Sequence, residues 1–312
     1  MQKYLDKYRN KKRCLFVNVS ETSFKLINGY KLNKLYKPII YSNDHLKDIG
    51  EYVRRLNIKI VIIDNTRVNH ISEKNIEILS SLKMIGVEVL DAQHFYEILN
   101  RRVSLVKFNP HKYHVDDIFS IGISPSQAVL KRFLDLFAAV LCIPIALPLI
   151  LLGISFVKIS SKGNAFFIQE RIGENSKPFY IYKIRTMEDI VNMDGSVDKK
   201  ITRVGKLLRQ TKIDELPQLY NIFNGDMSLI GPRPETYRYV IEAVNENAFF
   251  NLRHLIKPGI TGWAQVHLPK ATPKDNLKKL EFDLYYIKNY SILLDIETIM
   301  RTIRIILTMN SN

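Results

Sequence analysis

The sequence predicts a two-part chain: a small parallel α/β domain, then a mostly helical, mixed α/β domain associated with a membrane. Three observations lead to this expectation. Strand and helix signals alternate over residues 13–108, residues 133–157 form an apolar run, and the chain after that run is basic and punctuated by glycine. Alternating strands and helices are typical of a parallel sheet covered by helices, and a long apolar run is typical of a membrane segment.

The N-terminal domain is expected over residues 1–108. Short runs of β-branched and aromatic residues predict strands, and apolar residues at helical spacing predict helices between them. The strands are expected at residues 14–19, 38–41, 58–64 and 87–90, and the helices at residues 43–56, 72–85 and 94–100. Asn43 or Asp44 would cap the first helix and Ser72 the second. No G-x-G-x-x-G motif opens a helix, so we expect an accessory domain without dinucleotide chemistry.

Residues 109–130 carry proline, glycine and polar side chains, and this composition predicts a linker. Its residues His111, His114, Asp116 and Asp117 are candidates for a metal site. Histidines in a linker are usually solvated, so we expect no metal there.

The apolar run at residues 133–157 contains one charge, Asp135. As a straight helix it would measure about 38 Å, enough to cross the hydrocarbon core of a bilayer. A buried core helix is the alternative. Pro144 and Pro148 lie inside the run and should kink or break the helix. We expect a helix–break–helix that enters one leaflet and returns, with both termini cytoplasmic and Asp135 at headgroup depth.

The chain has 312 residues, a formal net charge of +15 and a pI near 9.6. Such an excess of Lys and Arg suits nucleic acid, anionic lipid or anionic substrates. Signatures of nucleic-acid-binding folds are absent and a membrane run is present, so we expect lipid and phosphorylated substrates and no nucleic acid. Cys14 and Cys142 are far apart in the sequence, which indicates neither a disulfide framework nor a zinc site and fits a reducing cytosol.

A pair of carboxylates, Asp214 and Glu215, follows a run of cations that ends near Arg209 and Lys212. A helix is expected over residues 216–223, with Pro217 in its first turn. The pair would then lie at the positive end of the helix dipole, which keeps a carboxylate ionised. Simple N-capping is the alternative reading of the pair. Arg residues grip phosphate oxygens in bidentate fashion, so the preceding cations are candidates for binding phosphate.

Two loops further along could present backbone N–H groups to phosphate. The first is Gly231, Pro232, Arg233 and Pro234, and the second contains Gly259, Thr261, Gly262 and Trp263. After them, residues 289–308 show the spacing of an amphipathic helix. This helix is expected either to lie on a membrane surface or to pack on the domain.

Six ordered motifs resemble the bacterial sugar transferases, the monotopic phosphoglycosyl transferases that load a sugar phosphate onto a polyprenyl phosphate. The motifs are KRFLD from residue 131, QERIG at 169–173, YKIRTM at 182–187, DELPQL at 214–219, GDMSLIGPRPE at 225–235 and KPGITGWAQV at 257–266. Residues 131–312 are thereby identified as the transferase domain. The N-terminal half resembles the Rossmann-like domain of larger members, which follows a four-helix membrane bundle that this sequence does not contain.

The resemblance implies a re-entrant membrane helix that breaks at Pro148. It implies that Asp214 attacks the β-phosphate of a UDP-sugar, that UMP is released, and that polyprenyl phosphate then accepts the phosphosugar. It associates Glu215 with a required Mg²⁺. Motif positions expected to meet phosphates are Arg171, Lys183, Arg185, Arg209 and Arg233, and the two loops would contact the nucleotide sugar.

The resemblance places the enzyme at the cytoplasmic membrane, at the start of assembly of a capsule, O-antigen, exopolysaccharide or glycoprotein glycan. The sugar and the oligomeric state, including a homo-oligomer, are left open by the sequence. The alternative is a catalytically silent assembly or regulatory protein that retains the fold. The intact carboxylate pair favours the enzyme.

Overall fold

The computed structural model divides into two compact units, Met1–Ile118 and Phe119–Asn312, which are described separately. The structure describes residues 11–42, 49–64, 73–105, 122–191, 196–272 and 275–308. The expected caps Asn43, Asp44 and Ser72 and the linker residues His111, His114, Asp116 and Asp117 lie outside these ranges.

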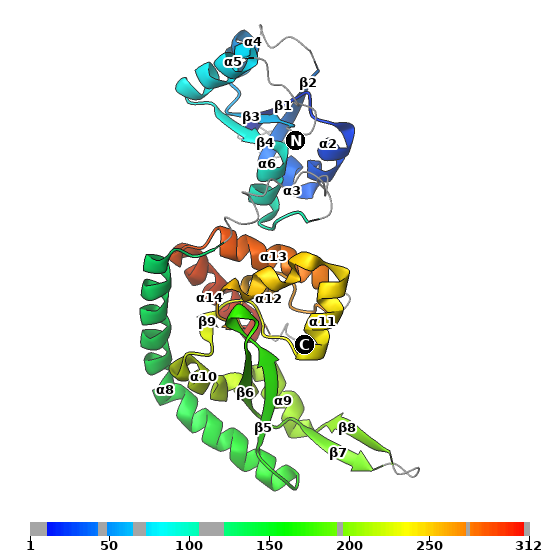
Figure 1. The fold of residues 1–312 in the computed structure, drawn as a ribbon, viewed down its shortest axis with the longest axis vertical. Coiled ribbons are helices and arrows are strands. Elements are labelled where there is room, and N and C mark those ends of the chain that lie inside the picture. The colour runs from blue at the N-terminus through cyan, green and yellow to red at the C-terminus, as the bar shows by residue number, and fades with distance from the viewer. Residues whose placement is uncertain are drawn as a thin grey trace, which may run out of the picture. The chain divides into compact units, whose positions relative to one another are not determined.

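The N-terminal unit is built on a four-stranded parallel sheet, which confirms the expected parallel α/β arrangement (Figure 1). The strands are β1 (Lys12–Val17), β2 (Tyr36–Tyr41), β3 (Ile60–Ile63) and β4 (Glu88–Asp91), in the order β2-β1-β3-β4. The register aligns Cys14 with Ile60 and Val17 with Ile63. The strands are short, and the central strand β3 consists entirely of β-branched residues, as buried parallel strands often do.

Helices cover both faces of this sheet. They are α2 (Glu21–Ile27), α3 (Tyr30–Leu35), α4 (Ile49–Arg55), α5 (Glu73–Met84) and α6 (Ala92–Asn100). Successive side chains of a strand point to opposite faces. Phe16 accordingly joins the cluster with α2, α3 and α6, while Leu15 joins the cluster with α4 and α5. No helix was expected between residues 19 and 38, where α2 and α3 lie. The signal for α2 was its N-cap, Ser20, whose side chain accepts a hydrogen bond from the Ser23 backbone.

The C-terminal unit is mixed α/β and mostly helical (Figure 1). Its strands form an antiparallel pair β5 (Phe166–Ile172) and β6 (Pro178–Ile184), an antiparallel pair β7 (Met187–Val191) and β8 (Val197–Ile201), and a parallel pair β9 (Ser228–Ile230) and β10 (Gly259–Thr261). Its helices are α8 (Pro125–Ser160), η3 (Glu174–Ser176), α9 (Arg203–Thr211), η4 (Ile213–Gln218), α10 (Leu219–Asn224), α11 (Tyr237–Glu246), η5 (Ala248–Leu255), α12 (Trp263–His267), α13 (Asn276–Lys288) and α14 (Ile292–Leu307).

The apolar run lies within α8, a helix of 36 residues that would measure about 54 Å if straight. It begins at a capping box on Ser124, so residues 125–130 are already helical although a linker was expected to reach residue 130. The expected break at Pro144 and Pro148 is not seen, because α8 continues through both. The helix instead changes direction along its length (Figure 1). Proline removes one backbone hydrogen bond and bends a helix, while the turns on either side hold it together.

The two sides of α8 differ in residue size. Small residues such as Ala139, Ala146 and Gly153 are buried against the domain. A Cβ atom at Gly153 would lie 2.8 Å from the Ile184 side chain, so the helix packs closely on β6. The outward side carries large apolar residues that are exposed, among them Phe137, Leu141, Ile145, Leu152 and Phe156. Only 17% of the most apolar window is buried, unlike the core helix of a soluble protein, and α8 is long and apolar enough to cross a membrane.

Asp135 is buried inside the protein, where it contacts both a cation and a backbone N–H group. One of its carboxylate oxygens accepts a hydrogen bond from the Leu229 backbone, 3.1 Å away, and lies 3.7 Å from the Lys131 ammonium. Lys131 also pairs with Asp295 of α14 at 3.1 Å. A buried charge needs such partners, and these were invisible in a local reading of the apolar run. The cluster fixes α8 against α14 and β9.

The C-terminal helix α14 presents apolar residues to the outside. Leu293, Met300 and Leu307 are 78%, 62% and 79% exposed, whereas Leu294 and Thr298 are buried against the domain. Of the two expectations for this amphipathic helix, exposure of the apolar stripe favours a membrane surface over packing on the domain.

Candidate active site

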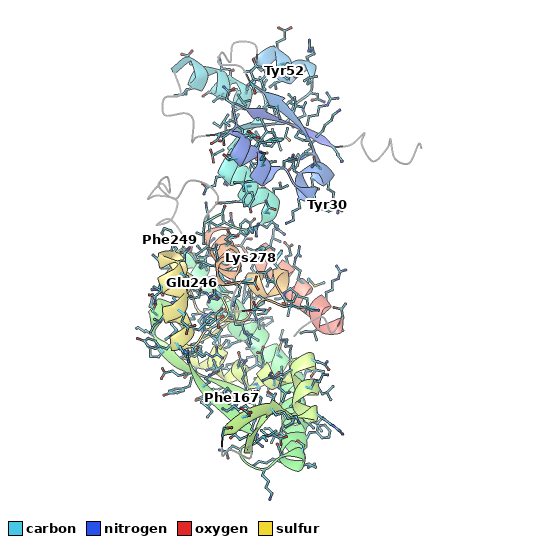
Figure 2. All side chains as sticks on the ribbon, turned by 90° about the vertical axis from the view of Figure 1, so that its right-hand side faces the viewer. Tyr30, Tyr52, Phe167, Glu246, Phe249 and Lys278 are labelled. Atoms are coloured by element: carbon cyan, nitrogen blue, oxygen red, sulfur yellow. The ribbon has the colours of Figure 1, made fainter. Side chains whose placement is uncertain are left out.

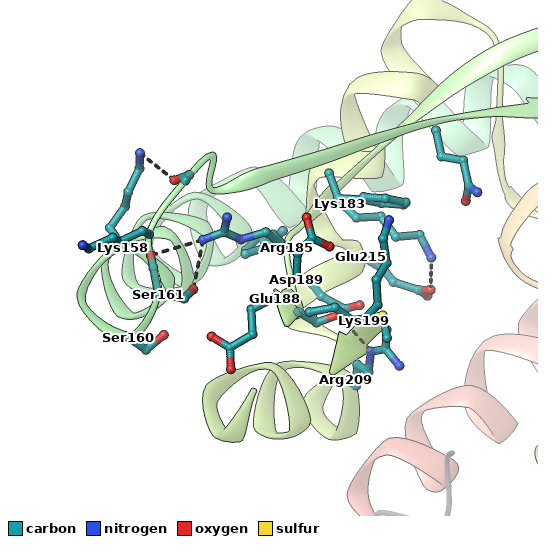
Figure 3. A pocket seen from close by; sticks show the side chains of 18 of the residues that line it. Lys158, Ser160, Ser161, Lys183, Arg185, Glu188, Asp189, Lys199, Arg209 and Glu215 are labelled. Atoms are coloured by element: carbon teal, nitrogen blue, oxygen red, sulfur yellow. Dashed lines mark hydrogen bonds and ion pairs between the residues drawn. The ribbon is translucent and has the colours of Figure 1, made fainter. Parts of the chain in front are cut away.

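A cavity of about 1300 Å³ opens in the C-terminal unit (Figure 3). Its walls come from the C-terminal end of α8, from strands β5 to β8, from α9 and from η4. Phe167 of β5, labelled in Figure 2, is one of its lining residues. The chain reaches the cavity because Lys212, the residue that follows α9, adopts a left-handed conformation (φ 60°), and η4 begins at the next residue. This turn delivers Asp214 and Glu215 to the cavity wall.

The cavity brings together the carboxylate pair and all five predicted phosphate-binding residues. These are Asp214, Glu215, Arg171, Lys183, Arg185, Arg209 and Arg233. Lys212, a member of the cationic run before the carboxylate pair, also lines it, and so do three cations that were not predicted, namely Lys158, Lys162 and Lys199. Nine Lys and Arg side chains thus face four carboxylates, which gives the cavity a positive field suited to a polyanionic ligand.

Glu215 is held in place by two cations from different segments. Lys183 of β6 lies 2.6 Å and Arg233 of the loop after β9 lies 2.8 Å from the same oxygen, Oε1. Burial alone would raise the pKa of Glu215, but the charges of Arg233 and Lys183 hold it well below its usual range. The carboxylate is therefore ionised, oriented and partly neutralised.

Asp214 has the opposite environment. Its Oδ1 is buried and has no hydrogen-bond partner among the described residues. Burial, together with the adjacent charge of Glu215, raises the pKa of Asp214 to about 6. We expected the dipole of an α-helix to keep this carboxylate ionised. The segment is instead a short 3-10 helix, and burial is the main cause of the raised pKa. Asp214 is thus a more basic carboxylate than an ordinary aspartate, and one of its oxygens is uncommitted.

The other predicted cations make hydrogen bonds or ion pairs with residues around the cavity. Arg209 donates to the Thr186 hydroxyl at 2.9 Å, and Arg185 donates to the Ser161 carbonyl and hydroxyl at 3.2 and 2.9 Å (Figure 3). Arg171 donates to Gln169 at 2.7 Å, and its guanidinium lies 3.8 Å from the Glu235 carboxylate. These bonds order the guanidinium groups before any ligand binds, which lowers the entropy lost on binding.

The two predicted loops lie side by side because β9 pairs with β10. Their glycines allow the close approach: a Cβ atom at Gly231 would lie 2.4 Å from the Lys257 carbonyl, and one at Gly262 would lie 2.1 Å from the Gly231 carbonyl. The Gly259 N–H donates to Pro232, and the Pro234 carbonyl accepts from Arg171.

Trp263 is 1% exposed and packs against His267, so it belongs to the core. Seven loop residues besides Arg233 were predicted to contact the nucleotide sugar. One of them, Thr261, lines a second, more apolar cavity. The close packing of the two loop backbones against each other therefore explains why glycine is needed at Gly231, Gly259 and Gly262.

The donor set is compatible with Mg²⁺ when a phosphate ligand completes it. Within the described ranges no group of three His, Cys, Asp or Glu side chains could hold a metal alone. Mg²⁺ is usually held by one or two carboxylates together with substrate phosphates and water. Asp214 offers an uncommitted oxygen, and both ion pairs of Glu215 use Oε1 rather than Oε2.

Comparison with known proteins gives a consistent match. A family model described as bacterial sugar transferase matches residues 126–309. A UDP-N-acetylgalactosamine-undecaprenyl-phosphate N-acetylgalactosaminephosphotransferase of Aeromonas hydrophila is 40% identical over 74% of this chain and 55% of its own length. A UDP-glucose:undecaprenyl-phosphate glucose-1-phosphate transferase of Escherichia coli is 35% identical over 67% of this chain and 46% of its own length.

An uncharacterised sugar transferase of Bacillus subtilis is 40% identical over 57% of this chain and 88% of its own length. The chain spans about half the length of the first two relatives. The Aeromonas match covers more of the chain than the C-terminal unit contains, so it extends into the N-terminal unit.

The opposite environments of the two carboxylates predict opposite effects on stability. The pKa of Asp214 is higher in the folded chain than its ordinary value of 3.8. Its ionisation therefore opposes folding, increasingly as the pH rises from about 4 to 6 and fully above that. Asp214→Asn should raise Tm at pH 8, with a gain of order 1–3 kcal/mol at roughly 2–4 °C per kcal/mol. The gain should vanish near pH 4.

Glu215→Gln is the matched variant and should lower Tm at pH 8. It leaves Lys183 and Arg233 without their shared partner, at a cost of about 1–3 kcal/mol. This is less than for a fully buried pair, because the Arg233 side chain is 40% exposed to solvent. Thermal unfolding in detergent, followed by intrinsic fluorescence over a pH series, measures both. Shifts of the same sign at pH 8 would contradict the assigned environments.

Proposed function

The chain belongs to the bacterial sugar transferase family, and on that premise we propose that it transfers a sugar 1-phosphate from a UDP-sugar to a polyprenyl phosphate. The products are UMP and a polyprenyl diphosphate sugar, the starting unit of a polysaccharide or other glycan. The observation that carries the proposal is the single cavity in which a carboxylate pair faces nine cations. Phosphoryl transfer depends mainly on such positioning and charge neutralisation.

We assign the nucleophile to Asp214. An oxygen of its carboxylate attacks the β-phosphorus of the UDP-sugar; the bond between that phosphorus and the bridging oxygen breaks, and the bridging oxygen leaves on UMP. The acceptor phosphate then attacks the same phosphorus and releases the Asp214 carboxylate. The uncommitted Oδ1 and the raised pKa support this role, because a more basic carboxylate is a better nucleophile.

Glu215 takes a different role because its Oε1 already accepts from two cations. Those contacts withdraw charge and fix the side chain, so it is poorly placed to attack. We propose that Glu215 holds Mg²⁺ through its other oxygen, together with oxygens of the diphosphate. When bound, the ion would neutralise charge that develops on the diphosphate. The cations Arg171, Lys183, Arg185, Arg209 and Arg233 serve the same end from the protein side.

We further propose that α8 is re-entrant and that the enzyme is monotopic on the cytoplasmic face of the membrane. The bend within α8, its exposed apolar side and the exposed stripe of α14 support this arrangement. A re-entrant helix keeps the nucleophile near headgroup depth, where the phosphate of a lipid acceptor lies. Residues 131–312 would form this catalytic domain and residues 1–108 a Rossmann-like accessory domain.

The nucleophile assignment predicts a covalent intermediate. With a UDP-sugar and Mg²⁺ but no acceptor, the enzyme should release at most one UMP per site and gain the mass of one phosphosugar. Asp214→Asn should abolish the adduct and lower turnover by at least about 10³-fold, as loss of a nucleophile does. Glu215→Gln should also lower turnover and change its Mg²⁺ dependence, whereas Glu246→Gln, on the exposed surface of α11, is the control. Peptide mass spectrometry that maps the adduct elsewhere would refute the assignment.

The re-entrant topology predicts that both termini are cytoplasmic. Single cysteines at Gln2 and Ser311, introduced after Cys14→Ser and Cys142→Ser, should resist an impermeant maleimide in intact cells and react after permeabilisation. Labelling of one end alone in intact cells would instead indicate a helix that spans the bilayer.

All residues of the catalytic cavity belong to the C-terminal unit, so we predict that the N-terminal unit is dispensable for sugar-phosphate transfer. A chain that begins at Ser124 keeps the capping box of α8 and every cavity residue named above. It should release UMP in nanodiscs at a rate close to that of the full chain. A truncated enzyme that unfolds cooperatively but releases no UMP would show that residues before Ser124 contribute to the site.

A further inference from the structure

A second cavity, of about 540 Å³, adjoins the first. Its walls come from α8, η4, α12, α14 and the loops near β9 and β10. Much of its lining is apolar and includes Leu216, Leu219, Ile260, Val266, Ile305 and Ile306. Such a wall suits a hydrocarbon ligand better than a nucleotide.

Three residues line both cavities: Lys212, Glu215 and Arg233. Asp214 lines the first cavity. The boundary between the two spaces therefore lies beside the proposed nucleophile and carries two cations. Arg233 is already paired with Glu215. Lys212 makes no ion pair within 4.0 Å with any residue the structure describes, although its charge acts on the neighbouring Asp214. The Lys212 ammonium can therefore pair directly with a ligand.

We propose that the second cavity binds the acceptor lipid, with its phosphate at Lys212 and Arg233 and its first isoprene units against α12 and α14. The inference rests on the transferase activity proposed above and assigns a place to one of its two substrates. The UDP-sugar would keep the larger, cationic cavity, and the two substrates would meet at the residues that the cavities share.

The walls of the second cavity are continuous with the exposed apolar faces of two helices. Cys142 of α8 lines the cavity, and its neighbour Leu141 is 60% exposed. Ile306 of α14 lines the cavity, and its neighbour Leu307 is 79% exposed. On the proposed topology these faces contact lipid. A prenyl chain can therefore pass from the bilayer into the cavity without leaving apolar surroundings.

Charge in the second cavity also favours the boundary as the phosphate end. Glu235 lies 3.7 Å from Lys279 and 4.0 Å from Arg253, and Arg253 pairs with Asp283 at 2.8 Å. These four charges cancel one another. Lys212 acts on Asp214 through its charge but makes no ion pair within 4.0 Å among the described residues, so an anionic headgroup is drawn toward the boundary.

Cys142 offers a direct test because its thiol is exposed and it lines the second cavity, so a bound ligand should shield it from alkylation. Of the two cysteines in the chain, Cys14 is fully buried and burial raises the pKa of its thiol to about 12, so it should not react. The full-length enzyme in nanodiscs, without UDP-sugar, is alkylated with N-ethylmaleimide. Undecaprenyl phosphate at tenfold its Kd should slow the reaction of Cys142 about tenfold, since about a tenth of the sites stay empty.

Three controls keep the result specific. Undecaprenol, which lacks the phosphate, should protect Cys142 much less. A UDP-sugar alone should not protect it. Leu141→Cys combined with Cys142→Ser moves the thiol one residue along α8, away from the cavity, and its alkylation rate should not respond to undecaprenyl phosphate. Equal slowing at this position would mean a bulk membrane effect and would overturn the proposal.

The proposal is also overturned if undecaprenyl phosphate leaves Cys142 unprotected, if undecaprenol protects it equally, or if a UDP-sugar protects it instead. As a second measurement, Cys142→Trp should raise the KM for undecaprenyl phosphate and leave that for the UDP-sugar unchanged, with Leu141→Trp as the matched control. The labelling needs no turnover. An enzyme that transfers sugar phosphate without protection of Cys142 refutes this inference alone, whereas absence of UMP release from any UDP-sugar refutes the proposed function.

Discussion

The buried contact of Glu215 with Lys183 and Arg233 is the interaction on which the catalytic unit depends. It joins η4, β6 and the loop after β9, three segments that are well separated in the chain. A charge taken out of water is tolerated only when its partners come with it, so each member fixes the other two. The cavity wall, the orientation of the carboxylate pair and the boundary between the two cavities all follow from this triad.

The same triad explains how two adjacent carboxylates acquire different chemistry. The cations gather on Glu215 and leave Asp214 desolvated beside a negative neighbour, which pushes the two pKa values apart. Pairs of titratable groups separated in this way are a recurring means of dividing roles in active sites. Both carboxylates belong to one short helix, η4. Their roles differ because only Glu215 pairs with Lys183 and Arg233.

The sequence predicted those parts of the molecule that are encoded locally. The parallel sheet follows from short apolar strands between helical segments. Six of the seven principal site residues lie in the recognised motifs, and one cavity brings these six together with Arg209. The features that the sequence did not predict involve distant partners. The burial of Asp135 depends on Lys131 and Leu229, and the link from Lys131 to Asp295 spans 164 residues, so a local reading could not identify these partners. Trp263 and its neighbouring glycines pack for reasons visible only once β9 and β10 lie together. Lys212 lines both cavities, and it occupies a left-handed turn that its residue type does not predict.

Arg185 gives the membrane helix a mechanical connection to the active site. It donates to both the carbonyl and the hydroxyl of Ser161, the residue that caps the C-terminal end of α8. On the proposed topology both ends of α8 lie on the cytoplasmic face, so its depth is set by how favourably its exposed apolar side enters one leaflet. Lipids that change the packing of that leaflet would shift Ser161 along the membrane normal and move an active-site guanidinium with it. Lipid composition thus becomes an input to the geometry of the phosphate site, so the bilayer acts as a part of the enzyme as well as its support.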